Sequence, residues 1–365
     1  MREPTVITLA NVFRKFIEIH LRDQMKCRLP VGKVPVSSLR RIVFRNLGMP
    51  DSRLLVGPGI GEDAAVAKAG GRLTILSTDP VTGALKNLGW LSVHINANDV
   101  ATRGARPKWY LCSIMLPENS SEDTLREIMR QIHRACLSLR VTVAGGHSEV
   151  TSVINRPVIV GFMVGEAERG RYFSSSGAEA GDSLIVTKSS GIEGTAIIAT
   201  DFAELLKEHL DSATIRRAQL LYRRISVVED ALTALDAGGV HAMHDPTEGG
   251  VLCGVWEFAE ASGLGVKIFG EDIPILNETK AVSKALGLNP LRMMSSGSLL
   301  IAARPSSSER IISRLSKKGI EATLIGEFTD IKKGRKIVYR DGGSADLKPP
   351  FPDEVYTLFK RLEGE

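Results

Sequence analysis

Four short acidic motifs lie at intervals along the first half of the sequence. Each places a carboxylate beside a glycine, an asparagine or the end of an apolar run. Mg²⁺ takes oxygen ligands, usually one or two carboxylates together with waters and substrate phosphates, so carboxylates converging from strand ends and tight loops would suit a metal–nucleotide site. A single aspartate usually indicates a solvated charge, whereas four motifs in this order favour such a site. The motifs are Gly61-Glu62-Asp63-Ala64-Ala65, Ser77-Thr78-Asp79-Pro80, Asn96-Ala97-Asn98-Asp99 and Gly145-Gly146-His147-Ser148-Glu149.

A further polar motif lies in the second half of the chain. His244 and Asp245 come just before a glycine pair that is expected to open a helix, with Thr247 as its cap. The N-terminus of a helix presents free N–H groups and a partial positive charge, which is a natural geometry for binding an anion. His244 and Asp245 are therefore further candidates for catalytic residues.

The familiar phosphate-binding loops are absent from the sequence. The run Gly57-Pro58-Gly59-Ile60-Gly61 lacks the spacing of a dinucleotide fingerprint, and Gly32-Lys33 is followed by valine where a Walker A loop has Ser or Thr. A bound nucleoside triphosphate would have to be held by metal bridges and loop amides. Lys33 could reach a phosphate as a point charge, although a solvated lysine is the reading we favour.

The composition describes an ordinary globular protein. The 365 residues suggest two domains, with 43% hydrophobic and 24% charged residues. The net charge of +5 is dispersed and has no stacking platform beside it, so we expect no nucleic-acid partner. None of the four cysteines forms a CxxC pair, which fits a reducing cytoplasm. No apolar run approaches the roughly 20 residues of a membrane span.

Periodicity divides the chain into four parts. We expect a helical N-terminal extension and linker over residues 1–49, a mixed α/β domain over 50–168, a second mixed α/β domain over 169–345 and a charged tail over 346–365 that ends in a short helix. The expected strands are 65–67, 73–77, 108–116, 141–144, 158–164, 183–187, 264–269, 297–303, 321–327 and 336–339. The expected helices are 5–26, 37–47, 91–104, 121–139, 195–208, 213–236, 249–262 and 306–318.

The order of the motifs resembles one family. The four acidic motifs, with Ala-Thr-Arg-Gly-Ala-Arg-Pro after Asp99, resemble the nucleotide-binding domain of the aminoimidazole ribonucleotide (AIR) synthetase superfamily, often called PurM-like. His244-Asp245-Pro246-Thr247-Glu248-Gly249-Gly250 and Ser295-Ser296-Gly297-Ser298 resemble its C-terminal domain. The resemblance covers about residues 30–345. It is greatest to the hydrogenase maturation factor HypE and AIR-synthase-related paralogues, and weaker to thiamine-monophosphate kinase.

The resemblance implies a two-domain fold, Mg-ATP as the cofactor and a homodimer whose N-terminal domains pair into a shared β-barrel. It implies an enzyme that activates an amide-like oxygen by phosphorylation, with hydrogenase or other metallocentre maturation as a setting that the resemblance suggests. Phosphoryl transfer depends on positioning and charge neutralisation, which bridging Mg²⁺ supplies. Carried over by position, Asp63, Asp79, Asp99 and Glu149 would hold Mg²⁺. Gly61, Asn98, Gly145 and Gly146 would contact the nucleotide.

Each assignment has a simpler alternative. Asp63 could cap a turn, Asp79 could be an ordinary turn residue, and His94 and His147 could be interior histidines. Glu248 stands where HypE typically has arginine, and no cysteine lies beyond Cys253 to match the terminal cysteine that accepts the carbamoyl group in HypE. These departures leave the acceptor open: a small molecule or a separate protein, which could be another maturation protein. The alternative functions are a non-catalytic ATP-binding assembly partner and a small-molecule kinase resembling thiamine-monophosphate kinase.

Overall fold

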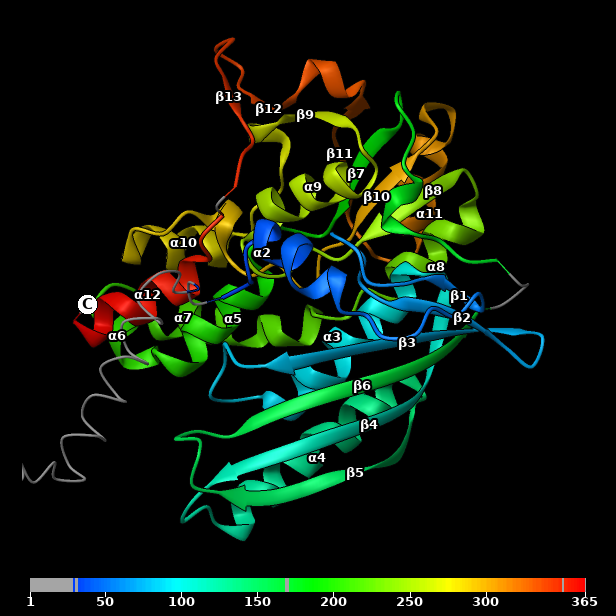
Figure 1. Ribbon diagram of the computed structural model, residues 1–365. Helices are drawn as coiled ribbons and strands as arrows, with labels where there is room; N and C mark the ends of the chain where they lie inside the picture. The colour runs from blue at the N-terminus through cyan, green and yellow to red at the C-terminus, as the bar shows by residue number, and fades with distance from the viewer. Residues whose placement is uncertain (1–28, 30–31, 168–170, 350, 365) are drawn as a thin grey trace, which may run out of the picture. The chain divides into compact units, whose positions relative to one another are not determined.

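The fold is described from a computed structural model (Figure 1), in which residue 29 and residues 32–167, 171–349 and 351–364 are described. These residues belong to two compact units, residues 1–46 and 47–365. In the first unit, α2 (Val36–Arg41) and one turn of 3₁₀ helix (Val43–Arg45) replace the single helix expected over 37–47. The expected helix 5–26 lies outside the described residues.

The second unit contains two separate sheets. The first sheet has six strands in the order β1-β2-β3-β6-β4-β5. All neighbouring strands pair antiparallel except β4 and β5, which are parallel and joined through α4. A parallel pair needs a crossover, and the helix supplies it. The elements are β1 (Leu54–Val56), β2 (Ala65–Ala69), β3 (Arg72–Val81), α3 (Leu88–Thr102), β4 (Ala105–Pro117), α4 (Glu122–Leu139), β5 (Thr142–Thr151) and β6 (Val158–Ala167).

Helices α3 and α4 cover one face of the first sheet, behind the strands in Figure 1. Glycines in β6 allow this packing: a Cβ atom on Gly161 would lie 2.4 Å from the Asn96 amide nitrogen, and one on Gly165 would lie 2.2 Å from Val100. Residues that alternate with these glycines therefore face away from the helices. That outer face is apolar, with Val158, Val160, Phe162 and Val164 along β6.

The second sheet has seven strands in the order β13-β12-β9-β11-β7-β10-β8. Its helices pack in two groups, α8 with α11 and α5 with α6, α7, α10 and α12, while α9 packs against β9. The elements are β7 (Ser183–Thr187), α5 (Ile192–Asp201), α6 (Ala203–Lys207), α7 (Ser212–Gln219), α8 (Val228–Ala237), β8 (Val240–His244), α9 (Gly250–Ala261), β9 (Gly265–Phe269), α10 (Asn277–Leu286), β10 (Leu300–Ala303), α11 (Ser308–Lys317), β11 (Ala322–Thr329), β12 (Arg335–Val338), β13 (Ser344–Asp346) and α12 (Glu354–Glu363).

Helix α3 connects the two sheets. It contacts β3, β4 and β6 of the first sheet and also α8 and β8. Every residue of α3 except Trp90 is buried, including His94, Asn98 and Asp99. A helix that is buried on all sides carries polar groups only where neighbouring elements bind them. The acidic motif on α3 is therefore held at the centre of the unit.

The mixed α/β class is confirmed, with some differences in the elements. The expected helix 213–236 is interrupted by a 3₁₀ helix (Leu220–Arg224) and a short non-helical stretch before α8 begins at Val228. Among the described strands and α-helices, four were not expected: β1, β8, β13 and α10. Strand β5 runs to Thr151, whereas a strand ending at residue 144 was expected.

The glycine pair in β5 gives a test of this strand pairing. A Cβ on Gly146 would lie 2.2 Å from the Cys112 carbonyl oxygen, whereas the nearest atom to a Cβ on Gly145 is 3.8 Å away. We expect Gly146→Ala to lower the free energy of unfolding by about 1–3 kcal/mol, and Gly145→Ala by less than about 1 kcal/mol. Urea denaturation of both variants measures this. Equal losses would contradict the described register of β5 on β4.

Candidate functional site

A wholly buried arginine organises the first acidic motif. Arg103 follows the last turn of α3; its Nη1 donates to Glu62 Oε2 at 2.8 Å and its Nη2 to Asp63 Oδ2 at 2.9 Å. Nη2 also donates to the Ser175 hydroxyl at 2.7 Å. A buried guanidinium needs such partners, because its desolvation is offset only by charged and hydrogen-bonding neighbours. Arg103 therefore ties the Glu62–Asp63 loop to the segment that leads into the second sheet.

Asp63 also binds the end of β8. His244 Nδ1 lies 2.7 Å from Asp63 Oδ1, and His244 Nε2 lies 3.5 Å from Glu257 Oε2 on α9. Burial alone would lower the pKa of His244, but the carboxylates of Asp63 and Glu257 outweigh it and raise the pKa to about 9. Burial alone would raise the pKa of Asp63, but His244 and Arg103 outweigh it and hold that pKa below its usual range. At neutral pH both groups are therefore charged, and they join the two halves of the unit.

Asp79 and Asp99 are held side by side through β3 and α3. The Ser77 hydroxyl donates to Asp99 Oδ2. The Asn96 side chain accepts from the Asp79 backbone N–H at 2.9 Å and donates to its carbonyl at 3.3 Å. Burial raises the pKa of Asp99 well above its usual range, and the charges of Asp79, Asp63 and Asp245 raise it further. These carboxylates are therefore close enough to repel one another.

Asp245 completes this group. Its carboxylate is buried, and neither oxygen has a well-formed hydrogen bond within the described part of the chain. Burial raises its pKa well above the usual range, and Asp63 raises it further. A buried carboxylate without a partner costs free energy that a bound cation would offset. The sequence predictions for Asp63, Asp79, Asp99, His244 and Asp245 thus fall on residues that the structure brings together.

The site carboxylates fit a Mg²⁺ ion that is bound partly by the protein and partly by the phosphates of a substrate. Among the described residues, no three His, Cys, Asp or Glu side chains are placed to hold one metal ion by themselves. Mg²⁺ is usually bound by one or two carboxylates and completes its shell with substrate phosphates and waters. Asp79 and Asp99 suit that arrangement better than Asp63, whose oxygens are already in ion pairs. Their metal role stays a prediction.

Other predicted residues have structural roles or lie elsewhere. The Asn98 amide accepts from the Val227 N–H at 2.8 Å and donates to the Ile225 carbonyl at 2.9 Å, so it fixes the segment before α8. Gly61 has φ +72°, and a Cβ there would lie 2.8 Å from the Glu257 carbonyl oxygen. Lys33 is an exposed residue of the first unit. The nucleotide contacts predicted for these three stay predictions.

Glu149 does not join the carboxylate group within one chain. It lies on the edge strand β5, and β6 and β4 stand between that strand and Asp79 on β3. Its neighbours on the strand, Gly145 and Gly146, lie within the ladder with β4 and not in a loop. His147 Nε2 is 3.2 Å from Glu149 Oε2, and both side chains are exposed. The roles predicted for Gly145, Gly146 and Glu149 remain predictions that would need a second chain nearby.

Sequence reasoning missed several residues of the site. Arg103 belongs to the Ala-Thr-Arg-Gly run that was used only for the family resemblance. Asn96 positions Asp79, and Ser77 binds Asp99. Glu193, in the first turn of α5, raises the pKa of Asp245 and was not considered. Asn96 could have been found from the sequence, because it is a polar residue inside the otherwise apolar helical run that forms α3.

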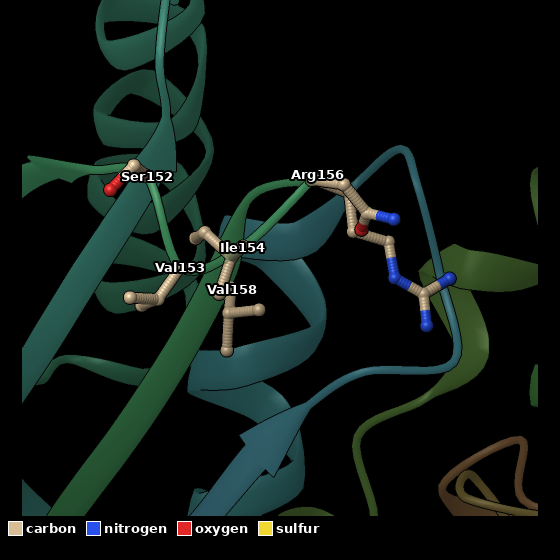
Figure 2. Close-up of a pocket in the computed structure, with 6 residues that line it drawn as sticks. Ser152, Val153, Ile154, Arg156 and Val158 are labelled. Carbon is tan, nitrogen blue, oxygen red and sulfur yellow. The ribbon is translucent and has the colours of Figure 1, made fainter. Parts of the chain in front are cut away.

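The structure also has an open hollow at the β5–β6 connection (Figure 2). Arg156 points away from Ser152 and Val153 there, as Figure 2 shows. None of the predicted site residues contributes to it. Its lining is Ser152, Val153, Ile154, Asn155, Arg156 and Val158.

Comparison with known families gives the same assignment as the motifs. Residues 61–167 match the N-terminal domain, and residues 179–338 the C-terminal domain, of the AIR synthase related proteins. The chain belongs to this family. The predicted family is therefore confirmed. In the part of the chain that the structure describes, no helix has both the length and the apolar character needed to cross a membrane.

The curated relatives include proteins of hydrogenase maturation. A hydrogenase expression/formation protein of Methanocaldococcus jannaschii is 28% identical over 83% of this chain and 90% of the relative. The carbamoyl dehydratase HypE of Escherichia coli is 28% identical over 76% of this chain and 80% of its own. Thiamine-monophosphate kinase of Aquifex aeolicus is 28% identical over 64% of this chain and 75% of its own.

Solved structures share the fold. The HypE–HypF complex contains a chain that matches with a TM-score of 0.69 and 21% identity, over 86% of this chain and 100% of that chain. HypE in complex with ATP matches with a TM-score of 0.66 and 21% identity, over 89% of this chain and 97% of that chain. These likenesses confirm the PurM-like two-domain fold.

The buried ion network gives a stability prediction. Arg103→Met leaves Glu62 and Asp63 without their guanidinium, so we expect a loss of about 3–5 kcal/mol in the free energy of unfolding at pH 7. Because the pKa of Asp63 lies below its ordinary value of 3.8, its stabilising contribution is present at neutral pH and is lost as the pH falls through the lowered pKa. Urea denaturation at pH 7 and at acid pH measures both effects.

Arg72→Met is the matched control. The ion pair of Arg72 with Glu166 lies at 3.4 Å, with Arg72 76% exposed. Exposed pairs contribute about 1 kcal/mol or less. If the two variants lost the same stability, the organising role of Arg103 would be wrong.

Proposed function

We propose that this protein is a Mg-ATP-dependent enzyme of the HypE type that phosphorylates a carboxamide-like oxygen of its substrate, with hydrogenase or other metallocentre maturation as its setting. The observation that carries the proposal is the group of neighbouring carboxylates at the junction of the two sheets. The carboxylates of Asp63, Asp99 and Asp245 are buried, and Asp79 is partly buried. Family membership and the relatives named HypE give independent support.

Each residue of the candidate site would have its own role in binding the nucleotide. Asp79 and Asp99 would hold Mg²⁺ against the phosphates, since their backbone and side-chain contacts already fix their positions. The charged His244 would keep Asp63 ionised, and Asp63 Oδ2 would hold Asp245 in place by accepting from its backbone N–H at 3.4 Å. Bound Mg-ATP would supply the phosphoryl group and neutralise the developing charge. Gly145 and Gly146 are proposed as further contacts.

The acceptor is proposed to be a small molecule or a separate protein. One of the solved relatives is the HypE–HypF complex, so a protein partner in maturation fits the same family. A cytoplasmic setting is consistent with Cys112 and Cys136, two buried cysteines that form no disulfide within the described residues.

Activity should depend on the carboxylates of β3 and α3. We expect Asp79→Asn and Asp99→Asn each to lower Mg-dependent ATP turnover by at least about 100-fold, because charge neutralisation of the phosphates is lost. Release of ADP and phosphate, with and without Mg²⁺, is the measurement. Asp236→Asn, at an exposed position on α8, is the control and should keep wild-type turnover.

If both Asp79→Asn and Asp99→Asn retained the fold and turned over ATP at the wild-type rate, the proposal would be wrong. ATP binding by calorimetry with no turnover in the wild type would favour a non-catalytic assembly partner.

The match to thiamine-monophosphate kinase favours a small-molecule kinase as the second candidate. In that case the γ-phosphoryl group would remain on the product, whereas in a dehydratase-type reaction it ends as inorganic phosphate.

We propose a homodimer formed through the face of the first sheet opposite to the one on which α3 and α4 pack. Phe162 pairs with Leu111 and Thr78, Val160 lies between Ser113 and Pro80, and Trp109 at the end of this face is 43% exposed. An apolar sheet face without helices over it is typical of a protein interface. Pairing there would place His147 and Glu149 at the interface and would allow Glu149 to serve a partner's nucleotide site.

The dimer has its own test. We expect Val160→Asp to convert a dimer into a monomer in sedimentation-velocity experiments, because the aspartate would be desolvated in the interface. Val153→Asp is the control, since Val153 is 83% exposed in the β5–β6 connection. A monomeric wild type, or a Val160→Asp variant that still dimerises, would refute the proposed interface.

A further inference from the structure

The hollow between the end of β5 and the start of β6 lies outside the candidate site (Figure 2). Its volume is about 410 Å³, within the range of sites that take small organic ligands. One part of its lining is apolar and the other part is polar. The apolar residues are Val153, Ile154 and Val158, and the polar residues are Ser152, Asn155 and Arg156. Such a lining suits a ligand that has an apolar body and one polar group.

Arg156 is the charged residue of this lining, and the chain does not neutralise it. Within the described residues, its guanidinium forms no ion pair and no hydrogen bond, although the residue is partly buried. No Asp or Glu lines the hollow. A guanidinium has five N–H donors and can bind a carboxylate through two of them at once. Arg156 can therefore bind an anion without first breaking an interaction within the chain.

The main chain of the connection leaves further donors unused. The Val153 N–H makes one long contact, with Thr151 Oγ1 at 3.5 Å, and in the described structure the N–H groups of residues 154–156 make no hydrogen bond. Pro157 restricts Arg156 to extended backbone conformations, so the arginine side chain starts from a fixed point. Successive free N–H groups favour a negatively charged ligand. The connection is therefore better suited to an anion than to a cation.

The hollow differs in charge from the candidate site. Gly161, five residues after Arg156, pairs with Asp79 on the neighbouring strand β3. The candidate site gathers carboxylates, whereas the lining of the hollow has a cation and no carboxylate. A ligand attracted by Arg156 therefore has the opposite charge to the Mg²⁺ that we propose for Asp79 and Asp99.

We propose that this hollow binds a small organic carboxylate, whose carboxylate group pairs with Arg156 and whose apolar body lies against Val153, Ile154 and Val158. One guanidinium balances one negative charge, so a carboxylate suits it better than a phosphate, which carries nearly two charges at neutral pH. The planar guanidinium also matches the planar carboxylate through two parallel hydrogen bonds. This inference goes beyond the proposed function and does not depend on it, since neither ATP nor Mg²⁺ takes part in the binding.

Benzoate, benzamide and phenyl phosphate are the probes, because they share an aromatic body and differ in the charge of the polar group. By calorimetry on the full-length protein without nucleotide, we expect benzoate to bind at least about tenfold more tightly than benzamide, and more tightly than phenyl phosphate. Arg156→Gln should weaken benzoate binding about tenfold and leave benzamide binding unchanged. Arg156→Lys should weaken benzoate binding about threefold, because lysine keeps the charge and lacks the planar fork.

Arg134→Gln, at an exposed position on α4, removes the same charge elsewhere and is the matched control, which should bind benzoate as the wild type does. Ile154→Ala should weaken the binding of benzoate and benzamide alike, by about threefold, because both lose the same apolar contact. It locates the site if Arg156→Gln does not fold.

Four results would each overturn the inference: no binding of benzoate by the wild type, equal binding of benzoate and benzamide, tighter binding of phenyl phosphate, or equal losses in Arg156→Gln and Arg134→Gln. Absence of Mg-dependent ATP turnover, with the preference for benzoate retained, would overturn the proposed function and not this site.

Discussion

The structure depends on one buried ion network, in which Asp63 lies between Arg103 and His244. The two cations come from different parts of the chain, one from the end of α3 and one from the end of β8. Each charge is desolvated, and each is compensated only while the others are in place. The network therefore couples the packing of the two sheets to the position of the first acidic motif. A change in any one of these charges would disturb the site and the joint between the sheets together.

Around this balanced network lie carboxylates that are not balanced. Asp99 and Asp245 are buried, and burial raises the pKa of each. The charge of Asp63 raises both pKa values further. Glu193 and Asp353 repeat the pattern at the helix starts of the second half. Perturbed pKa values of this kind cluster at functional sites, because function needs charges in places where stability alone would not put them. Mg²⁺ bound between the first group and the phosphates would supply the missing positive charge there.

In several elements, tertiary contacts give a different secondary structure from the one that the local sequence pattern predicts. The run 213–236 has helical spacing, but the Asn98 amide binds the backbone at residues 225 and 227 and holds it out of a helix. Strand β8 was missed because two histidines interrupt its short apolar pattern, and its burial comes from pairing with β10. The glycine pair in β5 suggested a loop, yet the ladder with β4 continues through it because β4 supplies partners along its whole length.

By itself, the sequence determined the mixed α/β class, the family and most of the residues in the first carboxylate group. Those features depend on local composition and on the order of motifs, which one chain displays directly. Tertiary packing makes Asp63 a paired charge, turns the Asn98 amide to backbone groups, and leaves β6 and β4 between Glu149 and Asp79. The structure also showed that the charge of Arg103 lowers the pKa of Asp63 and that Glu193 raises the pKa of Asp245. Burial and the distance between charges set these roles, and both arise only when segments distant in sequence are packed together.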